Sequence, residues 1–332
     1  MIKDRNCLLR ASIIVVSYNG MLENTAPCLE SIFKETNYYD YEVIVVDNNS
    51  TDGTQGYLRQ LAARHHNIKF VLNKSNRGFA GGTNDGIHAS SGNYLVLLNN
   101  DTAVTKGWLE RLLKPLNEDR AIGMVGPVSN EVGNEQRIFV RGTTPEVIME
   151  EGYAWTNMSS GDIFETDRLG FFCVAMRGEL TETVGLLDEK FSLGYFEDDD
   201  YCIRVKNAGY RLVCCEDVFI YHRGSKSFAK RENPTHTLMK KNKKLLEKKF
   251  HIKYSPPHPR DRHLELIGSY IERIKKEGLA SGLMYKIDNR LRLLEGMKPR
   301  GLLKKLRFER RLNHLNNLLR QYTRCEGRHH NE

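Results

Sequence analysis

Four consecutive carboxylates, Glu197–Asp200, stand between Tyr195-Phe196 and apolar residues at helical spacing. If they open a helix, its dipole favours acidic residues there and explains about two of the four. Crowded carboxylates raise one another's pKa, which suits a general base that removes a hydroxyl proton. The spacing of a calcium-binding EF-hand is absent. We therefore take Glu197 and Asp198 as candidate catalytic residues.

A second polar group, Asn99–Asp101, follows the apolar run Tyr94–Leu98. A carboxylate there can bind Mg²⁺ or Mn²⁺, hard cations that are often shared with substrate phosphates. Alternatively, the group caps the helix that follows. His222 likewise follows an apolar run, although a single histidine at a strand end is more often packed or hydrogen-bonded than a metal ligand.

Two earlier strand ends also carry polar residues, which are Ser17-Tyr18-Asn19 and Asp47-Asn48-Asn49-Ser50. Asp47 ends an apolar strand and can accept a hydrogen bond from a base N–H or a ribose hydroxyl. Asp52 and Thr54 serve the turn and the start of the next helix.

The glycine-rich segment from Asn76 to Gly86 opens a predicted helix, so its backbone N–H groups can face a diphosphate. It is neither a G-x-G-x-x-G motif nor a Walker loop. The alternative is a segment whose glycines allow tight packing. Arg77 favours anion binding.

The first 127 residues alternate short β-branched runs with helical segments, a pattern that predicts a parallel sheet covered by helices. Ligands of such sheets bind at the carboxyl ends of the strands, so three polar strand ends are expected to line one site. The expected strands are Ala11–Ser17, Tyr41–Asp47, Ile68–Leu72, Tyr94–Leu98 and Ile122–Val125; the expected helices are Thr25–Glu35, Thr54–His65, Phe79–Ala89 and Lys106–Asn117.

Beyond the first region, residues 128–168 have an irregular pattern and are predicted to form loops. A structured stretch follows, with an apolar run over 170–176, a helix from the acidic cluster to Ala208, and strands over 211–214 and 218–221. From about Pro234 the chain is basic and helical, with a break at Pro256–Pro259. We therefore divide the chain into residues 1–127, 128–233 and 234–332.

Charge separates these regions. The 332 residues carry 50 Lys and Arg against 42 Asp and Glu, but residues 236–332 alone carry 25 basic and 10 acidic side chains. No apolar run approaches the ~18 residues of a membrane span, and the first residues resemble no signal peptide, so we expect a cytoplasmic protein. The seven cysteines form no C-x-x-C pair and are expected to be reduced and buried.

Taken in order, these motifs resemble those of the family-2 glycosyltransferases. The resemblance covers about residues 11–228, and within the family it is most similar to the rhamnosyltransferase-like branch of bacterial surface-polysaccharide enzymes. The segments that carry it are 15–19, 43–54, 76–84, 97–102, 184–191, 195–204, 208–210 and 222–228.

The resemblance implies an α/β, A-type glycosyltransferase fold, in which a Rossmann-like, mostly parallel sheet has helices on both faces; here a basic helical extension would follow it. It implies a nucleotide-sugar-binding half over 1–127, an acceptor-binding and catalytic-base half over 128–233, and inversion at the anomeric carbon. Asp198 would be the base, with Glu197 beside it. Donor-binding residues would be Ser17, Tyr18, Asn19, Asp47, Asn49, Arg77, Asn84 and Asn100; Asp101 and His222 would hold Mg²⁺ or Mn²⁺.

One position departs from the family pattern, because the first carboxylate of its Asp-x-Asp motif is here Asn99. A carboxamide oxygen can still ligate a hard cation, but the site loses one negative charge. Asn99 is therefore the weakest of the expected metal ligands.

The implied partners are a uridine or thymidine diphosphate sugar as donor and a glycan or lipid-linked saccharide as acceptor. The basic extension either docks on the anionic inner face of the plasma membrane, or covers the catalytic domain or a homodimer contact. No nucleic-acid-binding module is recognisable. The alternatives are a non-catalytic sugar-nucleotide or glycan-binding protein, and a nucleic-acid-associated protein that acts through the extension.

Overall fold

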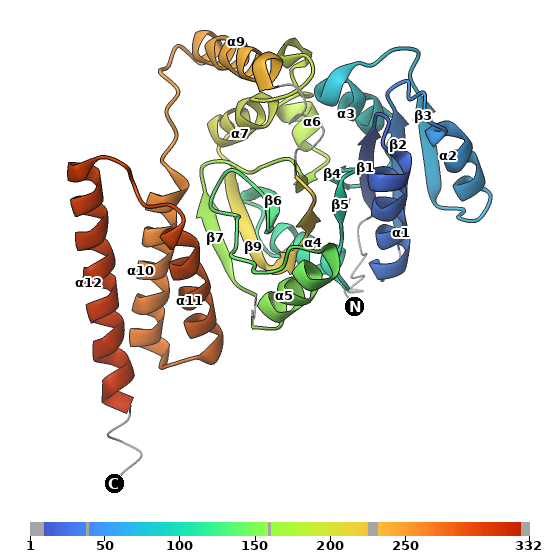
Figure 1. Cartoon of the computed structure of the whole chain (residues 1–332). Coiled ribbons are helices and arrows are strands. Elements are labelled where there is room, and N and C mark those ends of the chain that lie inside the picture. The colour runs from blue at the N-terminus through green and yellow to red at the C-terminus, as the bar shows by residue number, and fades with distance from the viewer. Residues whose placement is uncertain (1–9, 38–39, 159–160, 225–231, 327–332) are drawn as a thin grey trace, which may run out of the picture.

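The computed structural model describes residues 10–37, 40–158, 161–224 and 232–326 (Figure 1). Its centre is an eight-stranded sheet with the order β3-β2-β1-β4-β8-β6-β9-β7, in which β7 and β8 are antiparallel to their neighbours and the other neighbouring pairs run parallel. The strands are β1 (Ala11–Ser17), β2 (Tyr41–Asp47), β3 (Ile68–Leu72), β4 (Tyr94–Asn99), β6 (Ile122–Val128), β7 (Ile163–Thr166), β8 (Cys173–Arg177) and β9 (Arg211–Phe219). A second sheet pairs β5 (Thr102–Ala103) with β10 (Tyr221–His222).

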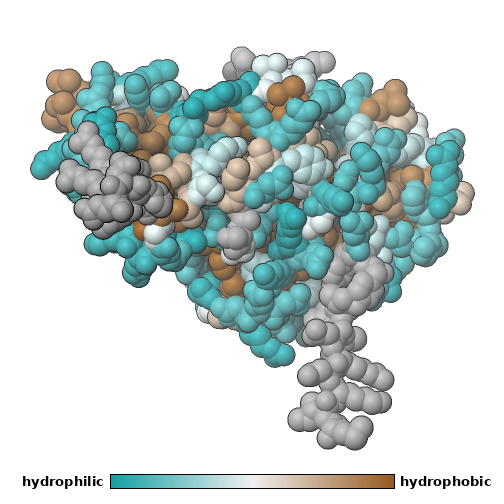
Figure 2. All heavy atoms as spheres, turned by 90° about the horizontal axis from the view of Figure 1, so that it is seen from below, coloured by the Kyte–Doolittle hydropathy of each residue, from teal (hydrophilic) through white to brown (hydrophobic). Residues whose placement is uncertain are grey.

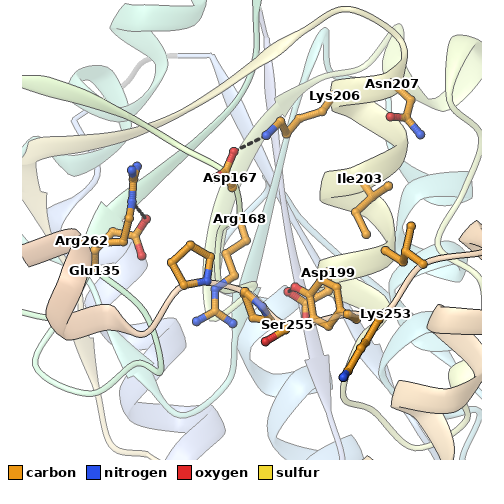
Figure 3. Close-up of a pocket in the computed structure, with 14 residues that line it drawn as sticks. Glu135, Asp167, Arg168, Asp199, Ile203, Lys206, Asn207, Lys253, Ser255 and Arg262 are labelled. Atoms are coloured by element: carbon orange, nitrogen blue, oxygen red, sulfur yellow. Dashed lines mark hydrogen bonds and ion pairs between the residues drawn. The ribbon is translucent and has the colours of Figure 1, made fainter. Parts of the chain in front are cut away.

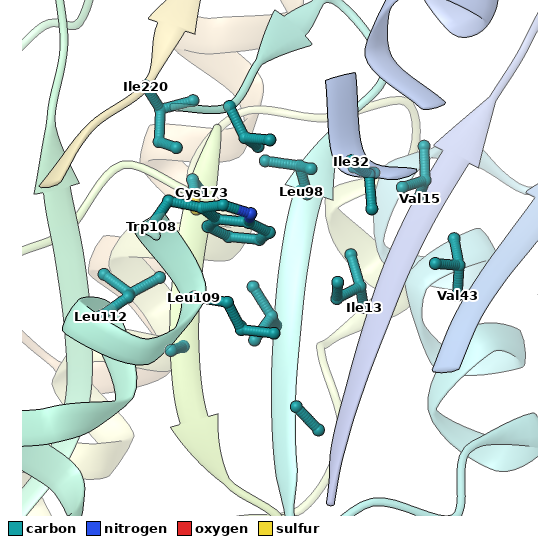
Figure 4. Close-up of a cluster of buried hydrophobic side chains, with 14 of the residues drawn as sticks. Ile13, Val15, Ile32, Val43, Leu98, Trp108, Leu109, Leu112, Cys173 and Ile220 are labelled. Carbon is teal, nitrogen blue, oxygen red and sulfur yellow. The ribbon is translucent and has the colours of Figure 1, made fainter. Parts of the chain in front are cut away.

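Helices cover both faces of the sheet, because β1, β2 and β4 are apolar on both sides and must be buried on both. Alternate residues such as Ile13, Val43 and Leu98 pack against one layer of helices, and Trp108 fills the space between that layer and the sheet (Figure 4). This layer contains α1 (Ala26–Glu35), α2 (Thr54–Ala62) and α4 (Trp108–Glu118). The other layer contains α3 (Gly78–Ala89), α6 (Leu180–Thr183) and α7 (Glu197–Asn207).

The expected elements of the first region are observed, with ends shifted by a few residues. The loop prediction for 128–168 was wrong in part, because this stretch contains α5 (Pro145–Asn157) and β7. Trp155 on α5 is buried, and its indole N–H donates to the Glu216 carbonyl on β9. The buried residues Ile148, Gly152 and Trp155 stand at helical spacing, but Gly152 in the middle of this face weakens the apolar pattern. Two short helical turns lie in the connections: η1 (Met21–Thr25) precedes α1, and η2 (Glu189–Phe191) lies between α6 and α7.

The five cysteines whose side chains are described are buried free thiols, as expected. Cys7 lies outside the described residues, and only the backbone of Cys325, in α12, is described. None of the helices in the described part of the chain is long and apolar enough to cross a membrane.

The basic extension forms α9 (Glu232–Phe250), α10 (Pro259–Glu277), α11 (Ser281–Glu295) and α12 (Leu302–Glu326). Helices α10, α11 and α12 share an apolar core (Figure 1). They are joined to the sheet by a buried ionic group in which Glu216 of β9 accepts from Arg290 at 2.7 Å and from Lys286 at 3.1 Å. Lys286 and Arg290 are themselves fully buried. Part of the positive charge of the extension therefore neutralises carboxylates of the sheet domain.

Candidate active site

The two-stranded sheet places His222 beside Asp101. Thr102 of β5 pairs with His222 of β10 in antiparallel register, and the Arg223 backbone N–H donates to the Asp101 carbonyl at 2.9 Å. Nε2 of His222 consequently lies 3.3 Å from Oδ1 of Asp101, with both side chains mostly shielded from solvent. The two residues that the family resemblance assigned to one metal site thus form a pair at the carboxyl end of β4.

His222 is held from three sides. Its Nδ1 lies 2.7 Å from the Glu131 carbonyl, its backbone exchanges two hydrogen bonds with the Asn130 side chain, and its ring stacks on Phe172 at 5.3 Å. Burial favours neutral imidazole, but the contact with Asp101 outweighs it and raises the pKa of His222 above its ordinary value. The ring is thus fixed in orientation, with Nε2 directed to Asp101.

The acidic cluster opens α7, as the sequence predicted. Tyr195 and Phe196, just before it, both adopt left-handed backbone conformations that are unfavourable for bulky residues. Asn242 of α9 holds this turn: its buried amide donates to the carbonyls of Phe191, Gly194 and Tyr195 at 2.8, 2.8 and 3.0 Å. Strained backbone before the carboxylates is therefore maintained by a residue of the extension.

The four carboxylates of α7 have different surroundings. Glu197 is buried, and burial together with Asp198 raises its pKa well above the ordinary value. Burial and the neighbouring Asp199 raise the pKa of Asp198 to about 7. This is the range expected for a general base that works near neutral pH. Of the two predicted catalytic residues, Asp198 is the one suited to accept a proton.

The remaining two carboxylates are tied to the extension. Tyr254 donates a 2.5 Å hydrogen bond to Asp199. Asp200 is fully buried and pairs with Arg204 at 2.8 Å and with Lys249 of α9 at 2.6 Å. Asp200 thus fixes α7 in place, and Asp199 faces the segment that follows α9.

A cavity of about 290 Å³ lies on this outer side of α7, between the helix and residues 252–257 (Figure 3). Asp199 and Arg168 lie near its middle, while the ion pair of Lys206 with Asp167 lies along one side. The Arg168 guanidinium donates to the Gly133 carbonyl at 3.2 Å, and its positive charge opposes the rise in pKa of both Asp198 and Asp199.

The segment Leu169–Phe172 connects the acidic helix to the Asp101–His222 pair. Cys202, one turn after Asp198, contacts the backbone of Leu169, with its Sγ accepting from the N–H at 3.3 Å. At the other end, the Phe172 carbonyl accepts from the Asn99 N–H at 2.8 Å, while its ring stacks on His222. Three residue steps of extended chain span at most about 10 Å, so the two groups belong to one region.

The predicted donor-binding residues at the ends of β1, β2 and β4 form two hydrogen-bonded groups. In the first, the Asn100 side chain donates to the Thr25 hydroxyl at 3.0 Å. The Thr25 hydroxyl in turn lies 2.8 Å from the Ser17 hydroxyl. In the second, Asp47 accepts from the Ser50 backbone at 3.2 Å and from Gln55 at 2.9 Å. The strand ends therefore meet as predicted for parallel neighbours.

Asn19 joins the β1 and β2 ends, because its backbone N–H donates to the Ser50 hydroxyl and its side chain accepts from the Thr51 N–H, both at 2.8 Å. Tyr18 is 53% exposed, and Asn49 is exposed in a left-handed conformation. Both side chains are accessible to a ligand. Asp52 accepts from the backbone and hydroxyl of Thr54, in the turn role expected for it.

The glycine-rich segment has a packing role. A Cβ on Gly86 would lie 2.3 Å from Ile14, and one on Gly82 would lie 2.8 Å from Val16, so these glycines allow α3 to approach β1 closely. Asn84 is buried and exchanges 3.0 Å hydrogen bonds with the backbone of Leu187. These observations favour the packing alternative for the helix interior.

Arg77 lies at the start of α3, where it pairs with Asp85 and, at 2.9 Å, with Glu189. Its side chain is 39% exposed. Of the predicted donor-binding residues, Arg77 and Asn84 are thus bound to protein partners, whereas Tyr18 and Asn49 face solvent.

The Asp101–His222 pair supplies one carboxylate and one imidazole, a donor set compatible with Mn²⁺. Asn99 is half-buried at the end of β4. Within the described residues, no group of three His, Cys, Asp or Glu side chains is arranged to hold a metal ion. The pair therefore fits a cation only if oxygens from a bound diphosphate complete its coordination.

Sequence reasoning missed Asn242, Lys249 and Tyr254, which hold the acidic helix from the extension. It also missed Asn130 and Glu131, which orient His222. These residues belong to no motif, and the change in charge near residue 235 suggested a separate region. No sequence signal distinguishes them, because Asn242 and Tyr254 are two of several non-basic residues in a lysine-rich stretch.

Comparison with known proteins gives a consistent result. The model of glycosyl transferase family 2 matches residues 12–177. Glycosyltransferase AglE of Haloferax volcanii is 29% identical over 213 residues, covering 64% of this chain and 66% of AglE. The chain spans between 39% and 66% of the length of the first three curated relatives.

Two solved structures share the fold. GalNAc-T7 with UDP, GalNAc and Mn²⁺ aligns with a TM-score of 0.53 at 17% identity, over 64% of this chain and 44% of that one. Mannosyltransferase PcManGT from Pyrobaculum calidifontis, in complex with GDP-Man and Mn²⁺, aligns with a TM-score of 0.50 at 18% identity, over 93% and 75%. The A-type fold predicted from the sequence is thereby confirmed.

Proposed function

The chain belongs to glycosyl transferase family 2, and we propose on this basis that it is an inverting glycosyltransferase. It moves a sugar from a nucleoside-diphosphate sugar to a hydroxyl group of a glycan or lipid-linked saccharide, and it depends on a divalent cation. We place it in bacterial cell-surface polysaccharide assembly, in a rhamnosyltransferase-like branch of the family.

The observation that carries this proposal is the contact between Asp101 and His222. Their side chains come from distant parts of the chain and meet at 3.3 Å at the carboxyl end of β4. The helix-cap alternative does not account for Asp101, because α4 begins at Trp108 with Gly107 as its N-cap. A site for a cation shared with a diphosphate requires both side chains.

Proton transfer is assigned to Asp198. Its pKa of about 7 leaves it able both to be ionised and to remove the proton of an acceptor hydroxyl. The hydroxyl oxygen forms the new bond to C1 of the donor sugar as the bond from C1 to the diphosphate oxygen breaks. Inversion requires base and leaving group on opposite faces of the sugar, so the sugar would lie between α7 and the Asp101–His222 pair.

The departing nucleoside diphosphate carries negative charge that must be stabilised. A divalent cation held by Asp101 and His222, with Asn99 as a further candidate ligand, supplies that stabilisation when bound. Mg²⁺ and Mn²⁺ are both candidates. Arg77 adds positive charge if its pairing with Glu189 gives way to the donor.

The donor nucleotide, of uridine or thymidine type, would lie across the ends of β1, β2 and β4. Tyr18 and Asn49 offer exposed side chains there. The hydrogen-bonded floor of the site is formed by Ser17, Asn19, Asp47 and Asn100. Residues 1–127 would thus bind the donor, and residues 128–233 would bind the acceptor and supply the base. Asn84 would act on the donor only through the position of α3.

The extension, residues 234–332, is proposed to position α7 and to place the enzyme at the inner face of the plasma membrane. A lipid-linked acceptor would be presented there. The ion pair of Lys249 with Asp200 of α7 supports the first role, and the ion pair of Lys286 with Glu216 anchors the extension to β9.

The proposal is tested by calorimetry with uridine, thymidine, guanosine and cytidine diphosphates, each in Mn²⁺ and in EDTA, followed by transfer assays with the matching sugar nucleotides. We expect metal-dependent binding of one uridine or thymidine ligand, and release of its diphosphate with a suitable acceptor. Thymidine diphosphate-rhamnose as the preferred donor would support the proposed branch. Failure of all four to bind would contradict the proposal.

A further inference from the structure

The first turn of α12 exposes three leucines. Leu302, Leu303 and Leu306 are 74%, 74% and 54% exposed, and at 100° per residue they fall within one third of the helix circumference. The opposite side of the helix is anchored, because Phe308 is buried in the core shared with α10 and α11. The exposed leucines therefore belong to an ordered helix and share one face of it.

Positive charge surrounds this apolar turn. From Lys298 to Arg307 the chain carries five basic residues and no acidic one. Four cations, namely Arg260, Lys298, Arg300 and Lys304, line an open hollow of about 920 Å³ that also includes Leu302 and Leu303. Elsewhere the surface differs: the face seen in Figure 2 is largely hydrophilic, with hydrophobic residues in small separate groups.

We infer that this turn, together with the hollow beside it, docks on an anionic phospholipid surface. Apolar side chains next to an excess of basic ones are the features of interfacial helices, where leucines enter the acyl boundary and cations contact headgroup phosphates. The hollow would hold a headgroup phosphate. The inference deepens the proposed function, since it names the surface through which the extension would reach the membrane.

A second copy of the chain is a poorer occupant for this surface. A symmetric dimer would bring the same five basic residues of each copy together, and like charges at an interface oppose association. Nucleic acid would match the charge but would leave the three leucines exposed, because backbone phosphate contacts do not require apolar groups. An anionic bilayer satisfies both features.

The test is flotation of the full chain with vesicles of phosphatidylglycerol and phosphatidylcholine, and with vesicles of phosphatidylcholine alone. We expect binding to the anionic vesicles that weakens as salt is added. The triple variant Leu302→Ser/Leu303→Ser/Leu306→Ser should bind at least about tenfold less. The variant Lys298→Ser/Arg300→Ser/Lys304→Ser should lose on the order of a hundredfold.

A matched control removes the same charge from another place. Lys240, Lys241 and Lys244 lie on the exposed side of α9, so their replacement by Ser should leave most of the binding intact. Equal loss in this control would show that total charge, rather than the α12 turn, is responsible, and would overturn the inference. Absence of vesicle binding, or a dimer in sedimentation that dissociates in the leucine variant, would also overturn it.

All replaced side chains are exposed, so each variant is expected to fold like the wild type. Circular dichroism of each variant checks this. Transfer to a water-soluble acceptor should be unchanged in the leucine variant. A folded protein that binds vesicles but transfers no sugar would contradict the proposed function alone, and one that transfers sugar but binds no vesicles would contradict only the inference about α12.

Discussion

At the scale of single residues, the four adjacent carboxylates at the start of α7 have different roles. One is suited to accept a proton, and another is held in ion pairs. Glu197 is buried with its pKa raised well above the ordinary value, and Asp200 is neutralised by Arg204 and Lys249. Asp198 stands between them with a pKa of about 7. Position along the helix, rather than residue type, decides which carboxylate can take a proton.

Asp198→Asn should lower kcat on the order of 10³-fold, because the amide cannot accept the proton, while donor binding is retained. In the wild type, kcat/KM should rise with pH to a plateau above about pH 7, since the ionised form is active. Steady-state assays and calorimetry measure the two effects. Activity in the variant comparable to the wild type would refute the assignment.

Asp198→Asn should lower activity but raise the stability of the folded protein. Folding raises the pKa of Asp198, so its ionised form opposes folding, and this cost appears as pH rises from about 4 to above 7. Asp198→Asn should therefore raise Tm relative to the wild type at pH 8, but not at pH 4. Thermal unfolding at both values checks the prediction, and a lower Tm at pH 8 would contradict it.

Asp101→Ala should weaken donor binding in Mn²⁺ by roughly 10- to 100-fold, because a charged ligand is lost. In EDTA the variant and the wild type should bind the nucleotide equally. Calorimetry in the two buffers separates these effects. Unchanged metal dependence in the variant would show that Asp101 does not hold the cation.

At the scale of elements, α7 depends on contacts from the segment after it in the chain. Asn242 of α9 holds the left-handed turn before the helix, and Tyr254 donates to Asp199. Asn242 contacts the turn and Tyr254 contacts α7 itself, so both act through the position and charge of this helix.

Tyr254→Phe should move the acid limb of kcat/KM to lower pH. The tyrosine hydrogen bond lowers the pKa of Asp199, and charge on Asp199 raises that of Asp198. Loss of the bond therefore favours neutral Asp199 and lowers the pKa of Asp198, while Arg168 still faces both groups. The pH profile is the measurement; Tyr153→Phe on α5 is the control. A shift to higher pH would contradict this account.

At the scale of the whole molecule, acidic and basic regions are joined by buried ion pairs. Glu216→Gln should destabilise the protein by about 3–5 kcal/mol, because the buried Arg290 would lose its carboxylate partner, while Lys286 would keep only Asp162. Urea unfolding measures the loss. Asp288→Asn removes the exposed partner of Arg292 and should cost under about 1 kcal/mol. Equal effects would show that the buried group contributes little.

The sequence was sufficient where local pattern and function coincide. Apolar runs followed by polar residues predicted β1, β2 and β4 and the meeting of their ends, and the acidic run predicted the start of α7. It was insufficient where a role depends on distant contacts. Asp101 and His222 meet through two-residue strands too short to show a pattern, Asn84 is engaged by a loop far along the chain, and Asn242 stands in a stretch that composition alone marks as separate.

The clamp of Asn242 on the turn before α7 also bears on how the protein is made. The strands β1 to β4 are synthesised first and can pair as soon as they emerge from the ribosome. The turn and its carboxylates reach their final positions only when the chain has been extended through α9 to Tyr254. During synthesis, the part of the sheet formed by β1 to β4 would therefore fold before Asp198 reaches its final position. Sugar transfer would begin only after the segment from α9 to Tyr254 has docked.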